Sequence, residues 1–251
     1  MELSPILLAG LLGAILGSFI NALSFRYNTG RGMSGRSRCM HCGHTLAVHD
    51  LVPLFSFAFL RGRCRYCKAK ISFQYPLVEL VAAVLAVLVY QSHFTSVETA
   101  LWFLVAMTLL FIVVYDIRHG IIPWSASAVL AVLALSHLVL MDGITLWGVL
   151  AGPLLALPLF LLSLVSRGTW MGWGDSVLEI SLGWLLGLSI GATALMLAFW
   201  SGAAVGIVLV VLKKGFRMNS ELPFAPFLVF GALAAHFLHV DFFAPLALLF
   251  S

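Results

Sequence analysis

Runs of about 20 apolar residues recur along almost the whole chain, and they constrain its fold more than any other feature. Of the 251 residues, 62% are hydrophobic and 10% are charged, whereas charged residues make up roughly 25% of an ordinary soluble domain. A helix that crosses a lipid bilayer needs about 20 predominantly apolar residues. The sequence therefore predicts an all-α polytopic membrane protein and excludes an ordinary soluble domain.

The apolar runs are separated by glycines, prolines and a few charged residues, which mark the ends of the expected helices. This pattern predicts about eight transmembrane helices, at residues 4–25, 76–91, 97–115, 124–141, 144–165, 176–189, 191–212 and 224–240. The first run has no Lys or Arg before Arg26, which is unlike a secretory signal. We therefore expect it to be a retained membrane helix. The sequence does not indicate an oligomeric state.

The positions of the basic residues predict the orientation, because short cytoplasmic loops collect Lys and Arg. Nine of the fourteen lie between Arg26 and Lys70. With eight alternating spans, the other five fall on the same side of the membrane: Arg118, Arg167, Lys213, Lys214 and Arg217. The net charge of +4 then reflects membrane orientation, and no nucleic-acid partner is expected.

Only one polar stretch is long enough to form a small domain outside the membrane, and it contains all four cysteines. They form two Cys-x-x-Cys pairs, Cys39 with Cys42 and Cys64 with Cys67. Two such pairs are typical of a tetrahedral four-thiolate zinc site. The sequence thus predicts a first transmembrane helix at 1–26, a cytoplasmic zinc-binding domain at 27–75 and a transmembrane domain at 76–251.

Two other interpretations of the cysteines are a pair of disulfides and a thioredoxin-like redox couple. Persistent disulfides are disfavoured in the reducing cytoplasm, and no strand-helix-strand pattern surrounds either pair. His41 and His44 are alternative ligands in place of one thiolate. Because so short a segment has a small core, the expected zinc is structural.

Four carboxylates are expected at or within the membrane, where an ionised side chain is costly: Glu79, Asp116, Asp175 and Glu179. Asp116 ends the third expected span and Asp175 opens the sixth, so both lie at the cytoplasmic rim. Two carboxylates that meet in a poorly solvated cleft share one proton. The ionised member can then activate water, and the protonated member can support the carbonyl oxygen under attack. This arrangement predicts an aspartic peptidase.

Residues near the aspartates have expected supporting roles. Gly172 and Gly174 have no Cβ, so substrate backbone can approach Asp175 closely or the turn can adopt a positive φ. Glu179 lies one helical turn after Asp175, and Glu79 is near the start of the second span; either supports the cleft or reaches the interface. The alternative is that both aspartates are solvated at loop edges, with Asp116 paired to Arg118 and Asp175 acting as a helix N-cap.

Five motifs in order resemble the bacterial type IV prepilin peptidases, the prepilin leader peptidase and N-methyltransferase family, and they extend over most of the chain. They are GSFINALSFR at 17–26, the two-knuckle segment from Ser37 to Leu80, YDIRHGIIP around Asp116, GWGD ending at Asp175, and LPFAPFL at 222–228. The resemblance implies that Asp116 and Asp175 are the catalytic pair and that the four cysteines bind zinc.

The resemblance also implies what such a protein does. A member would remove the short basic leader from type IV prepilins or type II secretion pseudopilins at the cytoplasmic face of the bacterial inner membrane. It would then methylate the new N-terminus with S-adenosylmethionine. The sequence does not identify the prepilins or the methyl-donor site.

One residue departs from the family pattern. The family usually has a lysine two positions after the second aspartate, and this chain has Val177. Two alternatives to an active peptidase remain open, and Val177 motivates only the first. One is a non-catalytic relative that binds prepilins, and the other is a proton-coupled transporter whose buried carboxylates relay protons.

Overall fold

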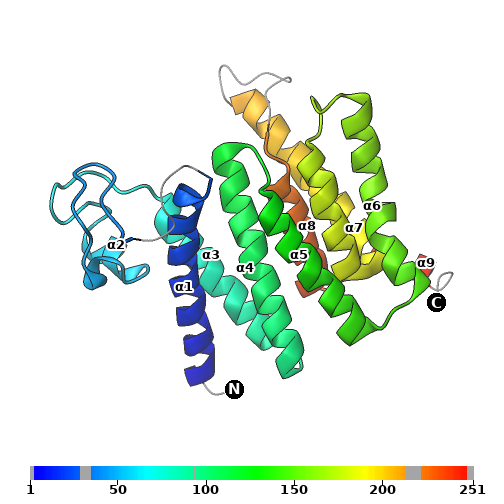
Figure 1. Cartoon of the computed structure of the whole chain (residues 1–251), viewed down its shortest axis with the longest axis horizontal. Coiled ribbons are helices and arrows are strands. Elements are labelled where there is room, and N and C mark those ends of the chain that lie inside the picture. Colours follow the sequence, from blue (N-terminus) through cyan, green and yellow to red (C-terminus); the bar gives the residue numbers. More distant parts are fainter. Residues whose placement is uncertain (1–2, 29–34, 93, 213–221, 248–251) are drawn as a thin grey trace. The chain divides into compact units, whose positions relative to one another are not determined.

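The computed structural model describes residues 3–28, 35–92, 94–212 and 222–247, and within them the fold is all-helical (Figure 1). The only β-type pairings in this part of the chain are two isolated bridges, Arg38 with Thr45 and Arg63 with Lys70. The predicted all-α fold class is confirmed. Lys213, Lys214 and Arg217, which contributed to the predicted orientation, lie outside the described residues.

The long helices follow the predicted apolar runs closely. They are α1 (Leu3–Arg26), α3 (Gln74–Gln91), α4 (Ser96–His119), α5 (Trp124–His137), α6 (Leu146–Val165) and α7 (Trp173–Leu212). A π-helical turn at Leu138–Asp142 extends α5. Counted with that turn, these six described helices are long and apolar enough to cross a membrane. The protein is therefore a multi-pass membrane protein.

The difference between six long helices and eight predicted spans has two causes. The sixth and seventh predicted spans form one 40-residue element, α7, which is interrupted at Gly187 (φ 74°, ψ 179°). A positive φ is easily adopted only by glycine, which explains why the helix breaks at this residue. The break is close to the predicted boundary between the sixth and seventh spans, at residues 189–191. The eighth predicted span is α8 (Ala225–Phe237), which has only 13 residues.

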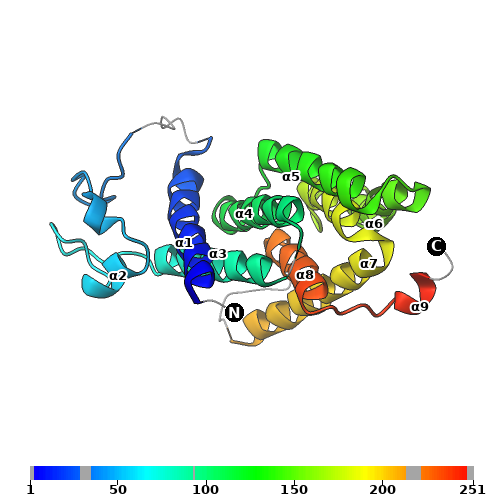
Figure 2. The same ribbon diagram turned by 90° about the horizontal axis from the view of Figure 1, so that it is seen from below.

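The chain divides into two compact units, Met1–Val114 and Tyr115–Ser251. In the first unit, α1 packs along α3 (Figures 1 and 2). The segment between them contains the short helices η1 (Val48–Asp50) and α2 (Phe55–Phe59). It also contains all four cysteines.

In the second unit, α7 packs against α5, α6 and α8 (Figures 1 and 2). Small residues allow close contact between α6 and α7: a Cβ added at Gly183 would lie 2.6 Å from Cα of Gly152. Such small-residue interfaces are typical of membrane helices, which associate through close packing. A short helix, α9 (Ala244–Ala247), ends the described chain. In this unit α7 is therefore the central helix, in contact with α5, α6 and α8.

Candidate functional site

The two predicted catalytic aspartates belong to the second unit and lie near each other there. Asp116 is in the last turn of α4 and Asp175 is in the first turn of α7. Their carboxylates are close enough to interact electrostatically. Asp116 is 5% exposed and Asp175 is 7% exposed, so neither is a solvated residue at a loop edge. The tertiary structure therefore brings together two buried carboxylates that are 59 residues apart in the sequence.

The start of α7 fixes the Asp175 side chain. The backbone N–H of Gly172 donates a hydrogen bond to Asp175 Oδ2 at 3.1 Å. Since α7 begins at Trp173, Asp175 is its third residue and caps the helix by reaching back. The alternative prediction that Asp175 is itself the N-cap is wrong, because helical residues precede it.

The loop before α7 is anchored to α6. The buried hydroxyl of Ser163 donates a hydrogen bond to the Met171 carbonyl at 2.7 Å. The ring of Trp173 packs edge-on against Phe160, with the centroids 5.5 Å apart. These contacts position the Gly-Trp-Gly-Asp turn and hence the Asp175 carboxylate.

Asp116 faces a different helix end. The backbone amide of Ala225, the first residue of α8, points to its carboxylate. The N-terminus of a helix carries a partial positive charge and favours an anion. Oδ2 of Asp116 has no hydrogen-bond partner among the described residues. The sequence did not reveal the contact with Ala225; its only signal was the resemblance of residues 222–228 to the family's last-helix entry.

The two glycines and Glu179 surround Asp175 in different ways. A Cβ added at Gly172 would lie 3.1 Å from Asp175 Oδ2, and one added at Gly174 would lie 3.0 Å from Cβ of Ile122. Gly174 therefore lets the first turn of α7 pack against Ile122, which is the third residue after the end of α4. Glu179 is 2% exposed on the same helix, and its Oε1 has no hydrogen-bond partner in the described part of the chain.

Glu79 belongs to the first unit, near the start of α3. Its Oε2 accepts a hydrogen bond from the backbone N–H of Leu54 at 2.8 Å. The Ser18 hydroxyl of α1 lies beside the same carboxylate. Glu79 thus joins α1, α3 and the cysteine-containing segment.

The four cysteines form a second candidate site. The Sγ atoms of Cys39, Cys42, Cys64 and Cys67 all lie within 4.8 Å of one another, and all four thiols are free. The Sγ atoms of Cys39 and Cys67 are 3.9 Å apart, close to the separation of about 3.8 Å in a tetrahedral Zn–S₄ site with Zn–S bonds of about 2.3 Å. The cluster can therefore hold one metal ion. His41 and His44 are not part of it, and the His44 ring packs on Tyr66 instead.

The two Cys-x-x-Cys segments form matching knuckles. The N–H of Gly43 donates to the Cys39 carbonyl at 2.9 Å, and the N–H of Lys68 donates to the Cys64 carbonyl at 3.0 Å. Each turn is closed by one isolated bridge between flanking residues. The knuckles point their thiols to one centre, which is why paired cysteines at this spacing suit a tetrahedral ion.

The thiols also perturb one another's protonation. Backbone hydrogen bonding at Cys42 is the main cause that lowers the pKa of Cys39 to about 6. The Ala69 backbone acts to lower the pKa of Cys67, but burial and the other three thiols outweigh it and raise the pKa to about 11. Because a metal ion binds thiolates, its binding would release protons from this cluster.

Asp50 supports the second knuckle from η1. Its carboxylate accepts hydrogen bonds from Arg65 Nε at 2.7 Å, Tyr66 Oη at 3.1 Å and the Ala47 backbone at 3.2 Å. Burial acts to raise the pKa of Asp50, but these bonds and nearby His49 outweigh it and lower the pKa. Asp50 therefore acts in its ionised form.

Comparisons with a family model and with known proteins all indicate the same peptidase family. The model for the bacterial peptidase A24 N-terminal domain matches residues 11–93, which contain the four cysteines but neither aspartate. A prepilin leader peptidase/N-methyltransferase of Burkholderia pseudomallei (strain 1026b) is 32% identical, with 89% of this chain and 72% of that protein aligned.

Other relatives also align with most of this chain. The type 4 prepilin-like proteins leader peptide-processing enzyme of Escherichia coli O78:H11 (strain H10407 / ETEC) is 32% identical, with 94% of each chain aligned. A prepilin leader peptidase/N-methyltransferase of Aeromonas hydrophila is 33% identical over 78% of this chain. No solved structure matches the chain. At this identity and coverage, the chain belongs to the prepilin leader peptidase/N-methyltransferase family.

Proposed function

We propose that the protein is an intramembrane aspartic endopeptidase that removes the leader from type IV prepilins or type II secretion pseudopilins. The observation that carries this proposal is the proximity of Asp116 and Asp175, both buried, in the second unit. Family membership supports the substrate class, because the relatives are named for processing prepilin leaders. The proposed location is the bacterial inner membrane, with the aspartates and the cysteine-containing segment at its cytoplasmic face.

The proposed chemistry uses one shared proton. The ionised member of the pair takes a proton from water as the water oxygen attacks the scissile amide carbonyl, and the protonated member donates a hydrogen bond to the carbonyl oxygen. When the tetrahedral intermediate breaks down, the C–N bond is cleaved and a carboxyl proton passes to the leaving amine. The Gly172 and Ala225 amides support the proposal because they orient the two carboxylates.

The other predicted residues of this site are part of the same proposal. Gly172 and Gly174 leave room at the start of α7, and Glu179 and Glu79 have supporting roles, with Glu79 acting through the cysteine-containing segment. The proposed domains are the first transmembrane helix at 1–26, the zinc-binding domain at 27–75 and the peptidase domain at 76–251.

Zinc is the proposed metal, held by the four cysteines in a structural role. Bound zinc would fix both knuckles about one centre, and the thiolate donor set fits this ion. Methylation of the new N-terminus, with S-adenosylmethionine as donor, is proposed from the relatives' names.

Cleavage of a prepilin by the purified protein, followed by mass spectrometry of the product, tests the proposal. We expect loss of the leader, and a further methyl increment when S-adenosylmethionine is added. Asp116→Asn and Asp175→Asn should each lower cleavage by at least 10³-fold, since each removes a group used in the transition state. Retained cleavage by either folded variant would reject the aspartic mechanism.

Val177 favours one alternative, a relative that binds prepilins without cutting them. This alternative predicts prepilin binding with no product from the unaltered chain. A cleaved product of the expected mass would reject it.

A further inference from the structure

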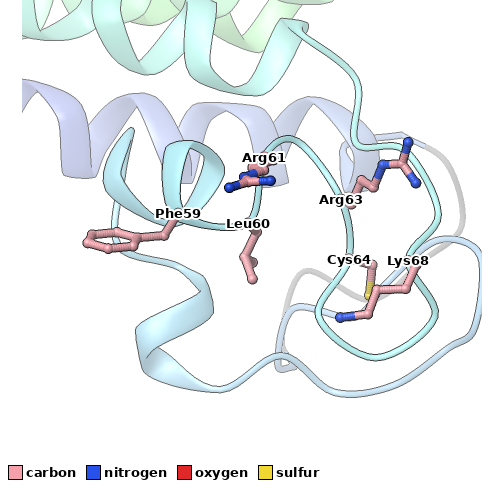
Figure 3. Close-up of a pocket in the computed structure, with 6 residues that line it drawn as sticks. All are labelled: Phe59, Leu60, Arg61, Arg63, Cys64 and Lys68. Atoms are coloured by element: carbon pink, nitrogen blue, oxygen red, sulfur yellow. The ribbon is translucent and has the colours of Figure 1, made fainter.

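A hollow of about 530 Å³ lies on the surface of the cysteine-containing segment (Figure 3). Its lining residues are Phe59, Leu60, Arg61, Arg63, Cys64 and Lys68. Cys39, Cys42 and Cys67 do not line it, so the hollow lies beside the metal-binding cluster and is separate from its centre.

The hollow carries positive charge that the described residues do not neutralise. Three of its six lining residues are cations, and none is acidic. Among the described residues, Arg61, Arg63 and Lys68 form no ion pair. Residues 27–75 contain eight Lys or Arg and a single acidic residue, Asp50, which is already engaged by Arg65 at 2.7 Å. The hollow is therefore suited to an anion.

Two of these cationic residues have an unusual backbone conformation. Arg61 and Lys68 have φ values of 50° and 59°, a left-handed conformation that side chains disfavour. In the first knuckle the position equivalent to Lys68 is Gly43, with φ 71°. In Figure 3 the Lys68 side chain extends from its loop toward the part of the view in which Leu60 lies. The second knuckle thus places a cation where glycine would fit more easily.

An exposed aromatic surface adjoins these cations. Phe59 is 84% exposed and Phe55, on the same short helix α2, is 59% exposed. The segment is attached at both ends to membrane-spanning helices, α1 ending at Arg26 and α3 beginning at Gln74. It is therefore held near the bilayer surface, where aromatic rings occupy the headgroup region and basic clusters attract anionic lipids.

We propose that the hollow binds the phosphate of an anionic phospholipid headgroup, with Arg61 and Lys68 as the main contacts and Phe59 in the interface. A free phosphate ion has the same chemistry. The lipid is favoured because Phe59 is exposed beside the cations and because the segment is attached to two membrane helices. This binding does not depend on peptidase activity.

The test uses the full-length, zinc-loaded protein in nanodiscs of phosphatidylcholine, with or without half of the lipid replaced by phosphatidylglycerol. Hydrogen exchange of residues 55–70 reports contact with the membrane surface. The variant is Arg61→Asn with Lys68→Asn, because asparagine tolerates the left-handed conformation. The control is Arg36→Gln with Arg38→Gln, which removes equal charge from the other knuckle, where both residues are exposed.

We expect phosphatidylglycerol to slow exchange in residues 55–70 in the unaltered protein and in the control. In the double asparagine variant the slowing by phosphatidylglycerol should be about 30-fold smaller. This is the factor expected for two basic side chains at an anionic surface. Zinc content verifies folding of each variant. If the asparagine variant loses zinc, Arg61→Gly with Lys68→Gly replaces it, since glycine adopts the same backbone conformation freely.

Three results would overturn the proposal. The first is no dependence on phosphatidylglycerol. The second is an equal loss in the Arg36 and Arg38 control, which would mean diffuse charge attraction. The third is the same slowing in phosphatidylcholine nanodiscs with added inorganic phosphate, which would assign the hollow to the free ion.

Discussion

The backbone N–H of Leu54 donates a hydrogen bond to Oε2 of Glu79 at 2.8 Å, which ties the cysteine-containing segment to the start of α3. Leu54 has a positive φ of 63°, so this contact also holds an unfavourable backbone conformation just before α2. A carboxylate near a membrane interface is here a link between a small extramembrane segment and two helices. This link explains why a costly acidic residue is present on an otherwise apolar helix.

The link predicts different outcomes for two substitutions at Glu79. Glu79→Leu leaves the Leu54 N–H without its acceptor and should destabilise the segment by about 1–3 kcal/mol. Glu79→Gln keeps an acceptor oxygen and should have a smaller effect. Hydrogen exchange of residues 46–60 measures the change, and equal exchange in the two variants would contradict the role of this bond.

Close packing at Gly174 predicts a loss of activity when a methyl group is added. In Gly174→Ala the new Cβ would lie 3.0 Å from Cβ of Ile122, so Ile122 or the first turn of α7 must move by a few tenths of an ångström. Since small misplacements of catalytic groups are costly, we expect prepilin cleavage to fall by about 10- to 100-fold.

The control for this substitution is Gly206→Ala on the same helix, where an added Cβ meets nothing within 4 Å. It should leave cleavage unchanged, because alanine is a better helix former than glycine. Full activity of Gly174→Ala would show that contact with Ile122 does not position Asp175.

We expect the rate of prepilin cleavage to rise when Val177 is replaced by lysine. Val177 is partly exposed, two residues after Asp175. An ammonium group there would favour the ionised carboxylate that activates water, and we expect Val177→Lys to raise the cleavage rate at neutral pH about 10-fold. Val177→Met is the matched apolar control, and an equal rate for both variants would exclude an electrostatic role for this position.

The cysteine cluster predicts metal content. The purified protein should contain about one zinc ion per chain, and Cys39→Ser with Cys42→Ser should lose it because only two thiolates remain. Metal analysis and hydrogen exchange of residues 35–70 check both the ion and the fold. Full zinc content in the double variant would refute the assignment of the ligands.

The bonds to Asp50 predict a stability effect with a defined pH range. Asp50→Asn should release zinc to a chelator faster, since it weakens two or three hydrogen bonds, at a cost of about 1–3 kcal/mol. The pKa of Asp50 is lowered in the folded protein. Its stabilisation is therefore fully present above the pKa of an unfolded aspartate, about 3.9, and is lost as the pH falls through the folded value.

The release difference between Asp50→Asn and the unaltered protein should therefore be constant from pH 5 to pH 8. A difference that disappears within this range would show that another group is responsible. Arg65→Gln provides a second measure of the same interaction.

The sequence by itself determined the features that depend on local pattern. Apolar run length gave the helices to within a few residues, because a membrane helix must satisfy all its backbone hydrogen bonds internally and stay apolar over its length. Cysteine spacing predicted the cluster, since each Cys-x-x-Cys forms one knuckle by local hydrogen bonds. The break in α7 at Gly187 falls two residues before the predicted end of the sixth span at residue 189.

Only the tertiary structure decided which distant groups meet. It placed Asp116 near Asp175 and the Ala225 amide, put Ile122 against Gly174, and assigned Glu79 to Leu54. These contacts depend on how helices pack and where they begin, which no short stretch of sequence specifies. A carboxylate at a helix end can be a cap, an ion-pair partner or half of an acid pair, and the side chains that surround it after folding determine which it is.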